Sequence, residues 1–315
     1  GPASAAMEMA IGNLLWPGRR VLILCNGLFS GRFAEMAEGV GAQVTVLDDP
    51  DGRPVSEPLV AEALKEASYD VVTMVQGETS TGVYTRDLKE IVALVGDHGA
   101  LSVVDAVCTL STVPLKKDEW GIDVVVTGSQ KGLSSIPGVS LIAFSERAWE
   151  VAAQRMAPKP HWCLDVMRAE KFWGQDSYHY TAPVPALLAL HEALRLIIEE
   201  TLEKRFKRHL HSSLSLQKGV EAMGLELYAP PEYRLNSVLS IEVPDGVDDA
   251  RARKYMTDRF KVLIADAFGI NAVRIGQMGE QCRAPNLFRT LHALGVAFAR
   301  QDLDLDQSAG MAAME

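Results

Sequence analysis

The first two-thirds of the chain alternate between short, nearly continuous apolar runs and amphipathic stretches. Six runs are rich in Val, Ile and Leu and have the length of β-strands: 21–25, 43–47, 70–75, 101–105, 122–127 and 139–144. Their apolar positions are consecutive rather than alternating, which is typical of strands buried on both faces of a parallel sheet. Helical patterns lie between several of them, at 32–40, 56–66 and 87–98. This order of elements predicts a doubly wound α/β domain.

The last third of the chain has a different pattern. Beyond a proline-rich stretch around 158–185, residues 186–223 are leucine-rich on one side and charged on the other, which predicts a long helix. Its charged run at 203–208 is expected to be a solvated helix face. Strand-like segments (237–243, 273–275) and helix-like segments (248–260, 284–299) then predict a smaller α+β domain. We expect a large domain over 1–195, a small domain over 196–303 and a disordered tail over 304–315.

Composition and charge narrow the class of protein. The chain has 315 residues, 48% of them hydrophobic, and a formal net charge of −10, so it is globular and acidic. An acidic surface disfavours nucleic acid as a partner, and the apolar runs are too short to span a bilayer. Its four cysteines lack C-x-x-C spacing, and the histidines lack the spacing of metal ligands. These features predict a cytoplasmic protein without a metal site, a nucleic-acid partner or a membrane partner.

Two residues with complementary chemistry follow neighbouring apolar runs. Asp105 ends one predicted strand, and Lys131 follows the next one on the loop Thr127-Gly-Ser-Gln-Lys131. Ligands of parallel sheets gather outside the carboxyl ends of the strands, so both side chains should reach one crevice. A lysine that forms a Schiff base and a carboxylate that pairs with a pyridinium nitrogen make a pyridoxal phosphate site. Taken alone, such a pair is more often a turn-capping aspartate and a solvated lysine.

Seven motifs carry a family resemblance over essentially the whole chain. They occur in family order: Asn26-Gly27, Gly77-Glu-Thr-Ser-Thr-Gly82, Val103-Val-Asp-Ala-Val107, Gly128-Ser-Gln-Lys131 with Pro137-Gly138, Phe172-Trp-Gly174, Tyr178-His-Tyr-Thr181 and Val273-Arg-Ile-Gly276. The sequence thereby resembles class V aminotransferases of fold type I, especially the alanine/serine–glyoxylate (or –pyruvate) group. The resemblance implies a mostly parallel, seven-stranded-type sheet with helices on both faces, and pyridoxal 5'-phosphate as the cofactor.

The resemblance also implies roles for the residues that act on the reacting atoms. Lys131 holds the cofactor as a Schiff base and moves the proton during transfer of the amino group, and Asp105 keeps the ring nitrogen protonated. Arg274 is implied as the clamp for the substrate carboxylate, because its forked guanidinium matches two carboxylate oxygens.

Other residues are implied to hold the cofactor ring. Val107 packs under the ring, Phe29 stacks on its other face, and Thr79 or Ser80 donates a hydrogen bond to its phenolic oxygen. Each of these four side chains also has an ordinary interpretation, as a core or turn residue.

The phosphate group is implied to bind at the opening residues, in a cup formed by Ala3, Ser4 and Ala5 with help from Gln130. This loop departs from the family pattern, because Pro2 and Ala3 replace the usual Ser and second Gly. Tyr178 and Thr181 match positions that reach the phosphate of the neighbouring subunit, which implies a homodimer with shared active sites. The family usually has several tens of residues before this loop, so its N-terminal segment is expected to be missing from this sequence.

The implied reaction moves an amino group from a small amino acid, such as alanine or serine, to glyoxylate or pyruvate. Three alternatives stay open: a transaminase for free pyridoxamine and pyruvate, another fold-type-I enzyme such as a lyase or desulfurase using Cys282, and a catalytically impaired binding or assembly subunit. Gln130 before the lysine favours a transaminase, because desulfurases of this fold typically carry His there.

Overall fold

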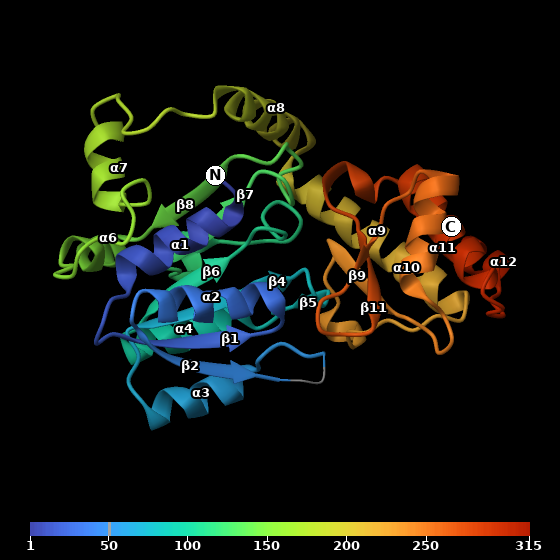
Figure 1. Cartoon of the computed structure of the whole chain (residues 1–315), viewed down its shortest axis with the longest axis horizontal. Coiled ribbons are helices and arrows are strands. Elements are labelled where there is room, and N and C mark those ends of the chain that lie inside the picture. Colours follow the sequence, from blue (N-terminus) through green and yellow to red (C-terminus); the bar gives the residue numbers. More distant parts are fainter. Residues whose placement is uncertain (50–51) are drawn as a thin grey trace.

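The computed structural model describes residues 1–49 and 52–315 and is built around a six-stranded sheet (Figure 1). The strand order is β2-β1-β3-β6-β7-β8, and all neighbours are parallel except β7 and β8. The strands are β1 (Arg20–Cys25), β2 (Gln43–Asp48), β3 (Val71–Val75), β6 (Leu101–Asp105), β7 (Val124–Gly128) and β8 (Ser140–Phe144). The fold is therefore the predicted α/β class, with six rather than seven strands in this sheet.

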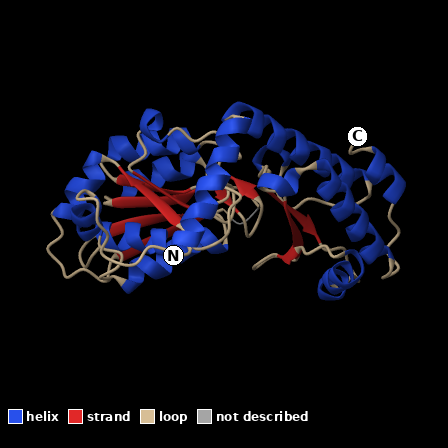
Figure 2. Ribbon diagram, turned by 90° about the horizontal axis from the view of Figure 1, so that it is seen from above, coloured by secondary structure: helices blue, strands red, loops and turns tan. Residues whose placement is uncertain are grey.

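Helices cover both faces of the sheet, because successive side chains of a strand point to opposite faces. Val21 and Ile23 of β1 pack with α1, α2 and α6, whereas Leu22 and Leu24 pack with α3 and α4. The covering helices are α1 (Ala3–Leu14), α2 (Leu28–Gly39), α3 (Glu57–Glu66), α4 (Leu88–His98), α6 (Glu146–Ala153) and α7 (Val166–Trp173). Figure 2 shows these helices on either side of the strands. The consecutive apolar residues of the sequence thus form two cores, one on each face of the sheet.

The outer strands differ from the prediction of fully buried strands. Four of the six residues of β2 are exposed, because β2 pairs with a neighbour on one side only. Strand β8 is half-buried and runs antiparallel to β7, and the loop that connects the two strands contains Lys131. Short elements complete this domain: β4 (Gly77–Glu78), β5 (Val83–Tyr84) and α5 (Lys117–Trp120).

The long helix expected over 186–223 is two helices, α8 (Val184–Glu200) and α9 (Leu202–Ala222). They meet at Thr201, whose φ of 69° lies in the left-handed region and ends the first helix. Helix α9 then packs into the small domain, which is built on an antiparallel sheet of order β10-β11-β9. The remaining elements are β9 (Val238–Glu242), α10 (Asp249–Tyr255), β10 (Ala265–Asp266), β11 (Ala272–Gly276), α11 (Ala284–Ala299) and α12 (Gln307–Ala312).

The last residues differ from the expected disordered tail. Asp306 caps α12 by accepting a hydrogen bond from the Ala309 amide, and Met314 is buried in the core of the small domain. Gly219 of α9 lets α12 approach, since a Cβ there would lie 3.0 Å from the Gly310 carbonyl oxygen. Packing of a few small and apolar residues therefore orders a segment whose sequence has no clear periodicity. In the part of the chain that the structure describes, no helix is both long and apolar enough to cross a bilayer.

Candidate active site

A small pocket lies where the parallel strands end, as the strand pattern predicts. Segments following β3, β6 and β7 meet there with the starts of α1 and α2. The pocket is lined by Ala3, Met7, Phe29, Gly77, Thr79, Asp105, Val107, Cys108, Gln130 and Lys131. Seven of the residues named from the sequence are thus brought together: Ala3, Phe29, Thr79, Asp105, Val107, Gln130 and Lys131.

Asp105 supplies a carboxyl group at the floor of this pocket. Its side chain is buried, and Oδ1 accepts a hydrogen bond of 2.7 Å from the Val107 amide. Burial raises the pKa of Asp105 to about 7. The hydrogen bond from the Val107 amide and the charge of the nearby Lys131 lower this pKa, but by less than burial raises it. The negative charge of Glu78 adds to the rise. A cationic N–H placed against this carboxyl would therefore stabilise its ionised form.

Lys131 enters the pocket from the loop that follows β7. Its Nζ donates a hydrogen bond of 3.4 Å to Thr79 Oγ1 and lies 5.4 Å from the centre of the Phe29 ring. The thiol of Cys108 also lines the pocket, but burial raises its pKa to about 12, so it stays protonated. Lys131 is therefore the side-chain amine among the residues that line this pocket.

The loop that carries Lys131 is held by Arg205, in the charged run expected to be a solvated helix face. That expectation is wrong for Arg205, which is 2% exposed. Its guanidinium donates to the Gly132 carbonyl at 2.9 Å and to Ser111 Oγ at 3.1 Å. Both Ser111 and Ser134, a further acceptor of Arg205 at 2.7 Å, have positive φ. The first turn of α9 thus fixes the residue next to the lysine.

Glu78 is a second residue whose importance the sequence did not reveal. Its fully buried carboxylate accepts hydrogen bonds from the amides of Phe29 and Ser30, in the first turn of α2, and from the amide of Ser80. The hydroxyl groups of Ser30 and Ser80 donate to it as well. Glu78 lies inside the motif 77–82, so the motif pointed to the segment but not to this anchoring role. It fixes Phe29 relative to the loop that carries Thr79.

Three predicted residues lie beside the pocket rather than in its lining. Ser80 is buried, and its hydroxyl donates a hydrogen bond of 2.6 Å to the Glu78 carboxylate. Thr79 is therefore the residue of this pair whose side chain lines the pocket. Ser4 and Ala5 follow Ala3 in the first turn of α1, and Ser4 Oγ accepts a hydrogen bond from Arg32.

Arg274 reaches the pocket edge from strand β11 of the small domain. Its guanidinium donates to the backbone carbonyls of Thr79 and Asp266, and its Cζ lies 5.1 Å from the centre of the Phe268 ring. Burial lowers the pKa of Arg274, which still leaves it a cation at neutral pH. A guanidinium held by carbonyl oxygens keeps its full positive charge for an anion.

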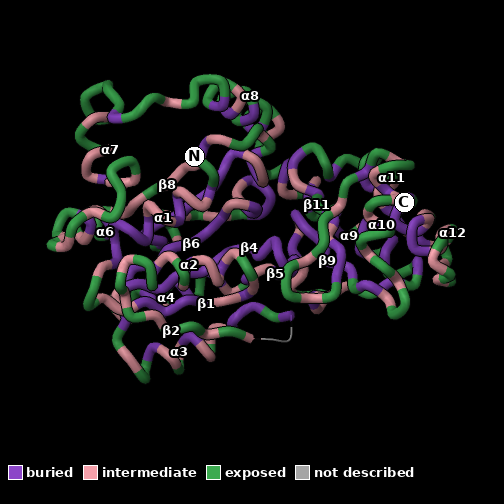
Figure 3. Tube along the Cα trace, in the orientation of Figure 1, coloured by how far each residue is buried: buried purple, intermediate pink, exposed green. Residues whose placement is uncertain are grey.

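Tyr178 and Thr181 lie away from this pocket within the same chain. Both are exposed, Tyr178 to 60%, on the segment between α7 and α8 (Figure 3). They lie outside the lining of the pocket in their own chain, and their predicted contact with the phosphate of a neighbouring subunit stays a prediction.

The residues present fit pyridoxal 5'-phosphate, the cofactor implied by the sequence. Asp105 offers a buried carboxyl for a pyridinium nitrogen, and Lys131 offers an amine. The side chain of Gln130 lies beside Ala3, since a Cβ on Gly128 would come within 2.8 Å of both. Helix α1 begins next to them with neither a side-chain cap nor an acidic residue in its first turn. Such a helix start suits a phosphate.

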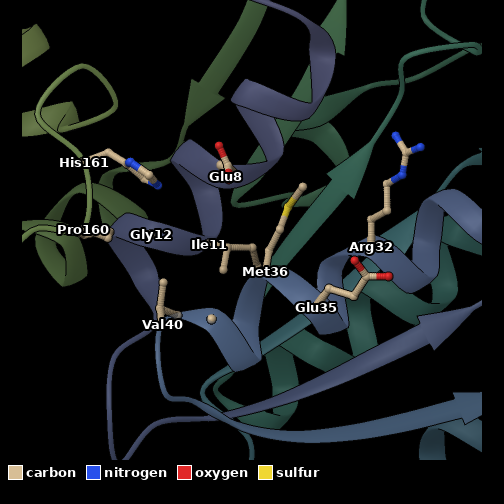
Figure 4. Close-up of a pocket in the computed structure, with 10 residues that line it drawn as sticks. Glu8, Ile11, Gly12, Arg32, Glu35, Met36, Val40, Pro160 and His161 are labelled. Carbon is tan, nitrogen blue, oxygen red and sulfur yellow. The ribbon is translucent and has the colours of Figure 1, made fainter.

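A larger cavity of about 540 Å³ lies elsewhere, between α1, α2 and the segment around residue 160. Figure 4 shows its lining, which includes Glu8, Glu35, Met36 and His161. Neither Lys131 nor Asp105 lines this cavity, so cavity volume alone does not identify the candidate active site.

Comparisons with known proteins agree with this geometry. The family model described as aminotransferase class-V matches residues 2–293. Alanine–glyoxylate aminotransferase of Rattus norvegicus is 33% identical over 93% of this chain and 73% of that protein. The solved structure of ureidoglycine–glyoxylate aminotransferase from Bacillus subtilis has a TM-score of 0.95 and 33% identity, covering 100% of this chain and 82% of the other. Pyridoxamine–pyruvate aminotransferase from Mesorhizobium loti has a TM-score of 0.95 and 28% identity, covering 100% and 81%.

Proposed function

The chain belongs to the class-V aminotransferase family, and we propose that it moves the amino group of a small amino acid to glyoxylate. Alanine or serine is the proposed donor, and pyruvate is the alternative acceptor. The names of two similar proteins support glyoxylate, because they combine it with two different donors, alanine and ureidoglycine. Glyoxylate, which both names share, is therefore a better guide to the substrates of this chain than either amino donor.

The observation that carries this proposal is the meeting of Lys131 and Asp105 in one pocket from the ends of two strands. Pyridoxal 5'-phosphate supplies an aldehyde carbon and an electron-withdrawing pyridinium ring when it is bound. The chain supplies the groups that hold it: Asp105 at the ring nitrogen, Phe29 and Val107 at the ring faces, and Thr79 at the phenolic oxygen. Ala3, Ser4, Ala5 and Gln130 surround the phosphate.

Lys131 carries the proton in this mechanism. With its amine free, Nζ would take the proton from the substrate Cα and hold it for return, while bound pyridoxal 5'-phosphate would supply the carbon that accepts the amino group. Thr79 Oγ1 holds Nζ in place, and Arg205 fixes the following backbone carbonyl. Arg274 binds the substrate carboxylate, which orients the Cα–H bond toward Lys131.

We also propose that two copies complete each other's sites. Tyr178 and Thr181 are exposed in one chain, and two further exposed aromatic residues lie near them in sequence: Trp173, the last residue of α7, at 59%, and Tyr180 at 41%. Exposed apolar side chains that gather on one segment mark contact surfaces. In a closed homodimer, Tyr178 and Thr181 of one copy would bind the phosphate in the other.

A second candidate function is transamination between free pyridoxamine and pyruvate. The 0.95 TM-score of the pyridoxamine–pyruvate aminotransferase favours it, although the identity is lower, 28%. Retention of the cofactor during equilibrium dialysis separates the two functions. A resident cofactor stays bound, whereas a vitamer that is itself a substrate is lost.

A desulfurase and a subunit without turnover both have less support. Cys282 is 1% exposed, and its Sγ contacts Arg208 at 2.7 Å in the small domain, outside the pocket lining. Burial raises the pKa of this thiol, which disfavours a desulfurase nucleophile. The joint placement of Lys131 and Asp105 argues against a subunit without turnover.

A nitrogen-transfer assay tests the proposed function. Protein loaded with pyridoxal 5'-phosphate is incubated with glyoxylate and one ¹⁵N-labelled amino acid from a panel, and labelled glycine is measured by mass spectrometry. We expect labelled glycine from alanine or serine and none with Lys131→Ala. If loaded protein makes no labelled glycine from any donor, the glyoxylate assignment is wrong, and pyruvate in the same assay identifies the alternative acceptor.

A further inference from the structure

Arg32 is a cation near the start of α1 that belongs to none of the sequence motifs. It lies on α2, and its Nη1 donates a hydrogen bond of 3.4 Å to Ser4 Oγ. Its Cζ lies 4.6 Å from the centre of the Phe29 ring. Arg32 thus touches a residue from the predicted phosphate loop and the aromatic ring that lines the cofactor pocket.

The guanidinium of Arg32 has no carboxylate partner within residues 1–49 and 52–315. Its contacts there are the hydrogen bond to Ser4 and the approach to the Phe29 ring. Glu35 lies on the same helix, and Figure 4 shows the Arg32 guanidinium directed away from that carboxylate. An unpaired guanidinium next to a helix start makes that site attractive for an anion.

The hydrogen bond to Ser4 has a consequence for the direction of the Ser4 hydroxyl. A hydroxyl has one proton to donate and two lone pairs. Because Arg32 donates to Ser4 Oγ, it occupies a lone pair and leaves the proton free for an acceptor. In the first turn of α1 the Ala5 amide donates to the Pro2 carbonyl at 2.8 Å, so the amides of Ala3 and Ser4 are the ones that a helix start offers to a ligand. The Arg32 guanidinium, the Ser4 hydroxyl proton and these two amides together favour an anionic oxygen ligand.

We infer that Arg32 is a phosphate-binding residue of the cofactor site, acting by its charge and by orienting the Ser4 hydroxyl. The inference rests on the proposed function, since the ligand is the phosphate monoester of the cofactor. It explains how a helix start with Pro2 and Ala3 in place of Ser and Gly still holds a doubly charged group. The stacking on Phe29 also couples this anion site to the ring-binding part of the pocket.

The test compares two vitamers that differ only in the phosphate. Dissociation constants for pyridoxal 5'-phosphate and for pyridoxal are measured by absorbance titration with cofactor-free protein. Arg32→Gln should weaken pyridoxal 5'-phosphate about tenfold, equal to about 1.4 kcal/mol, and leave pyridoxal within about twofold. Inorganic phosphate should compete less well with pyridoxal 5'-phosphate in Arg32→Gln than in the unmodified protein.

Three variants separate charge from packing. Arg32→Lys keeps the charge and should retain most of the preference for the phosphorylated vitamer. Ser4→Ala should lower the preference for pyridoxal 5'-phosphate over pyridoxal. The same substitution should lower this preference less when Arg32→Gln is already present, because the two residues act together. Glu35→Gln, on the same helix, is the matched control and should leave both constants unchanged.

Equal weakening of both vitamers by Arg32→Gln would show that Arg32 only supports Phe29 and would overturn the inference. No change in either constant would overturn it as well. Unmodified protein that binds neither vitamer contradicts the proposed function itself, so the two failures are distinct.

Discussion

The two halves of the active site differ in how the chain builds them. The half around Asp105, Lys131 and Glu78 follows the ends of central strands within one chain, with Asp105 and Glu78 buried and Lys131 half-buried. The half around Tyr178 and Thr181 lies on an exposed segment between α7 and α8. Under the proposed function, the first half holds the groups that act on the reacting atoms, and the second half would supply phosphate contacts only if another copy approached. Catalysis and cofactor retention should therefore respond differently to mutation and to dilution.

The largest effect is expected from Lys131→Ala. Loss of the amine removes both the anchor for the cofactor aldehyde and the proton carrier, so the transamination rate should fall by at least about 10³-fold. Circular dichroism should show an unchanged fold, because a loop lysine contributes little packing. Lys116→Ala is the control, since Lys116 is exposed and pairs with Glu119 at the surface. Transamination at the normal rate in Lys131→Ala would contradict the account of the buried half.

Asp105→Asn should come next, with a rate lowered about 10²-fold while the cofactor stays bound. The amide still accepts the Val107 N–H but stabilises a protonated ring nitrogen less well than a carboxylate. Single-turnover kinetics with alanine measure the loss, and absorbance after gel filtration measures cofactor retention. An unchanged rate would exclude the assigned role of Asp105.

The exposed half should respond through cofactor affinity rather than chemistry. Tyr178→Ala/Thr181→Ala should weaken pyridoxal 5'-phosphate about tenfold or more, because each site loses phosphate contacts. Mixing this variant with Lys131→Ala should restore activity, since one site of each mixed dimer carries all three changes and the other carries none. Verified mixed dimers without restored activity, or a dilute monomer with full cofactor affinity, would show that the site is not shared.

An effect on stability rather than on activity concerns the pH dependence of unfolding of the cofactor-free protein. Burial raises the pKa of Asp105 from 3.8 to about 7, so between these values the folded state binds the proton more tightly than the unfolded chain. The contribution of Asp105 to stability therefore falls as the pH rises through this range and is fully lost above it. Asp105→Asn should remove about 2 kcal/mol of this fall, as measured by urea unfolding at about pH 5 and about pH 8. Equal pH slopes for both proteins would contradict the raised pKa.

The sequence predicted those parts of the fold and the site that follow from local pattern. Consecutive Val and Leu residues identified the buried strands, and positions at the strand ends identified Asp105 and Lys131. Arg205 and Glu78 escaped prediction, because charged residues are usually exposed and only tertiary neighbours reveal a buried one. The break between the two helices at Thr201 was not predicted either, because the amphipathic pattern of the sequence continues across it.

The most direct test of the central claim is to find where the cofactor is attached. Protein loaded with pyridoxal 5'-phosphate is reduced with borohydride, digested and mapped by mass spectrometry, with Lys131→Ala treated in parallel. The account predicts a cofactor-modified peptide that contains Lys131, and no such modification in the variant. Stable modification at another lysine, with Lys131 unmodified, would contradict it.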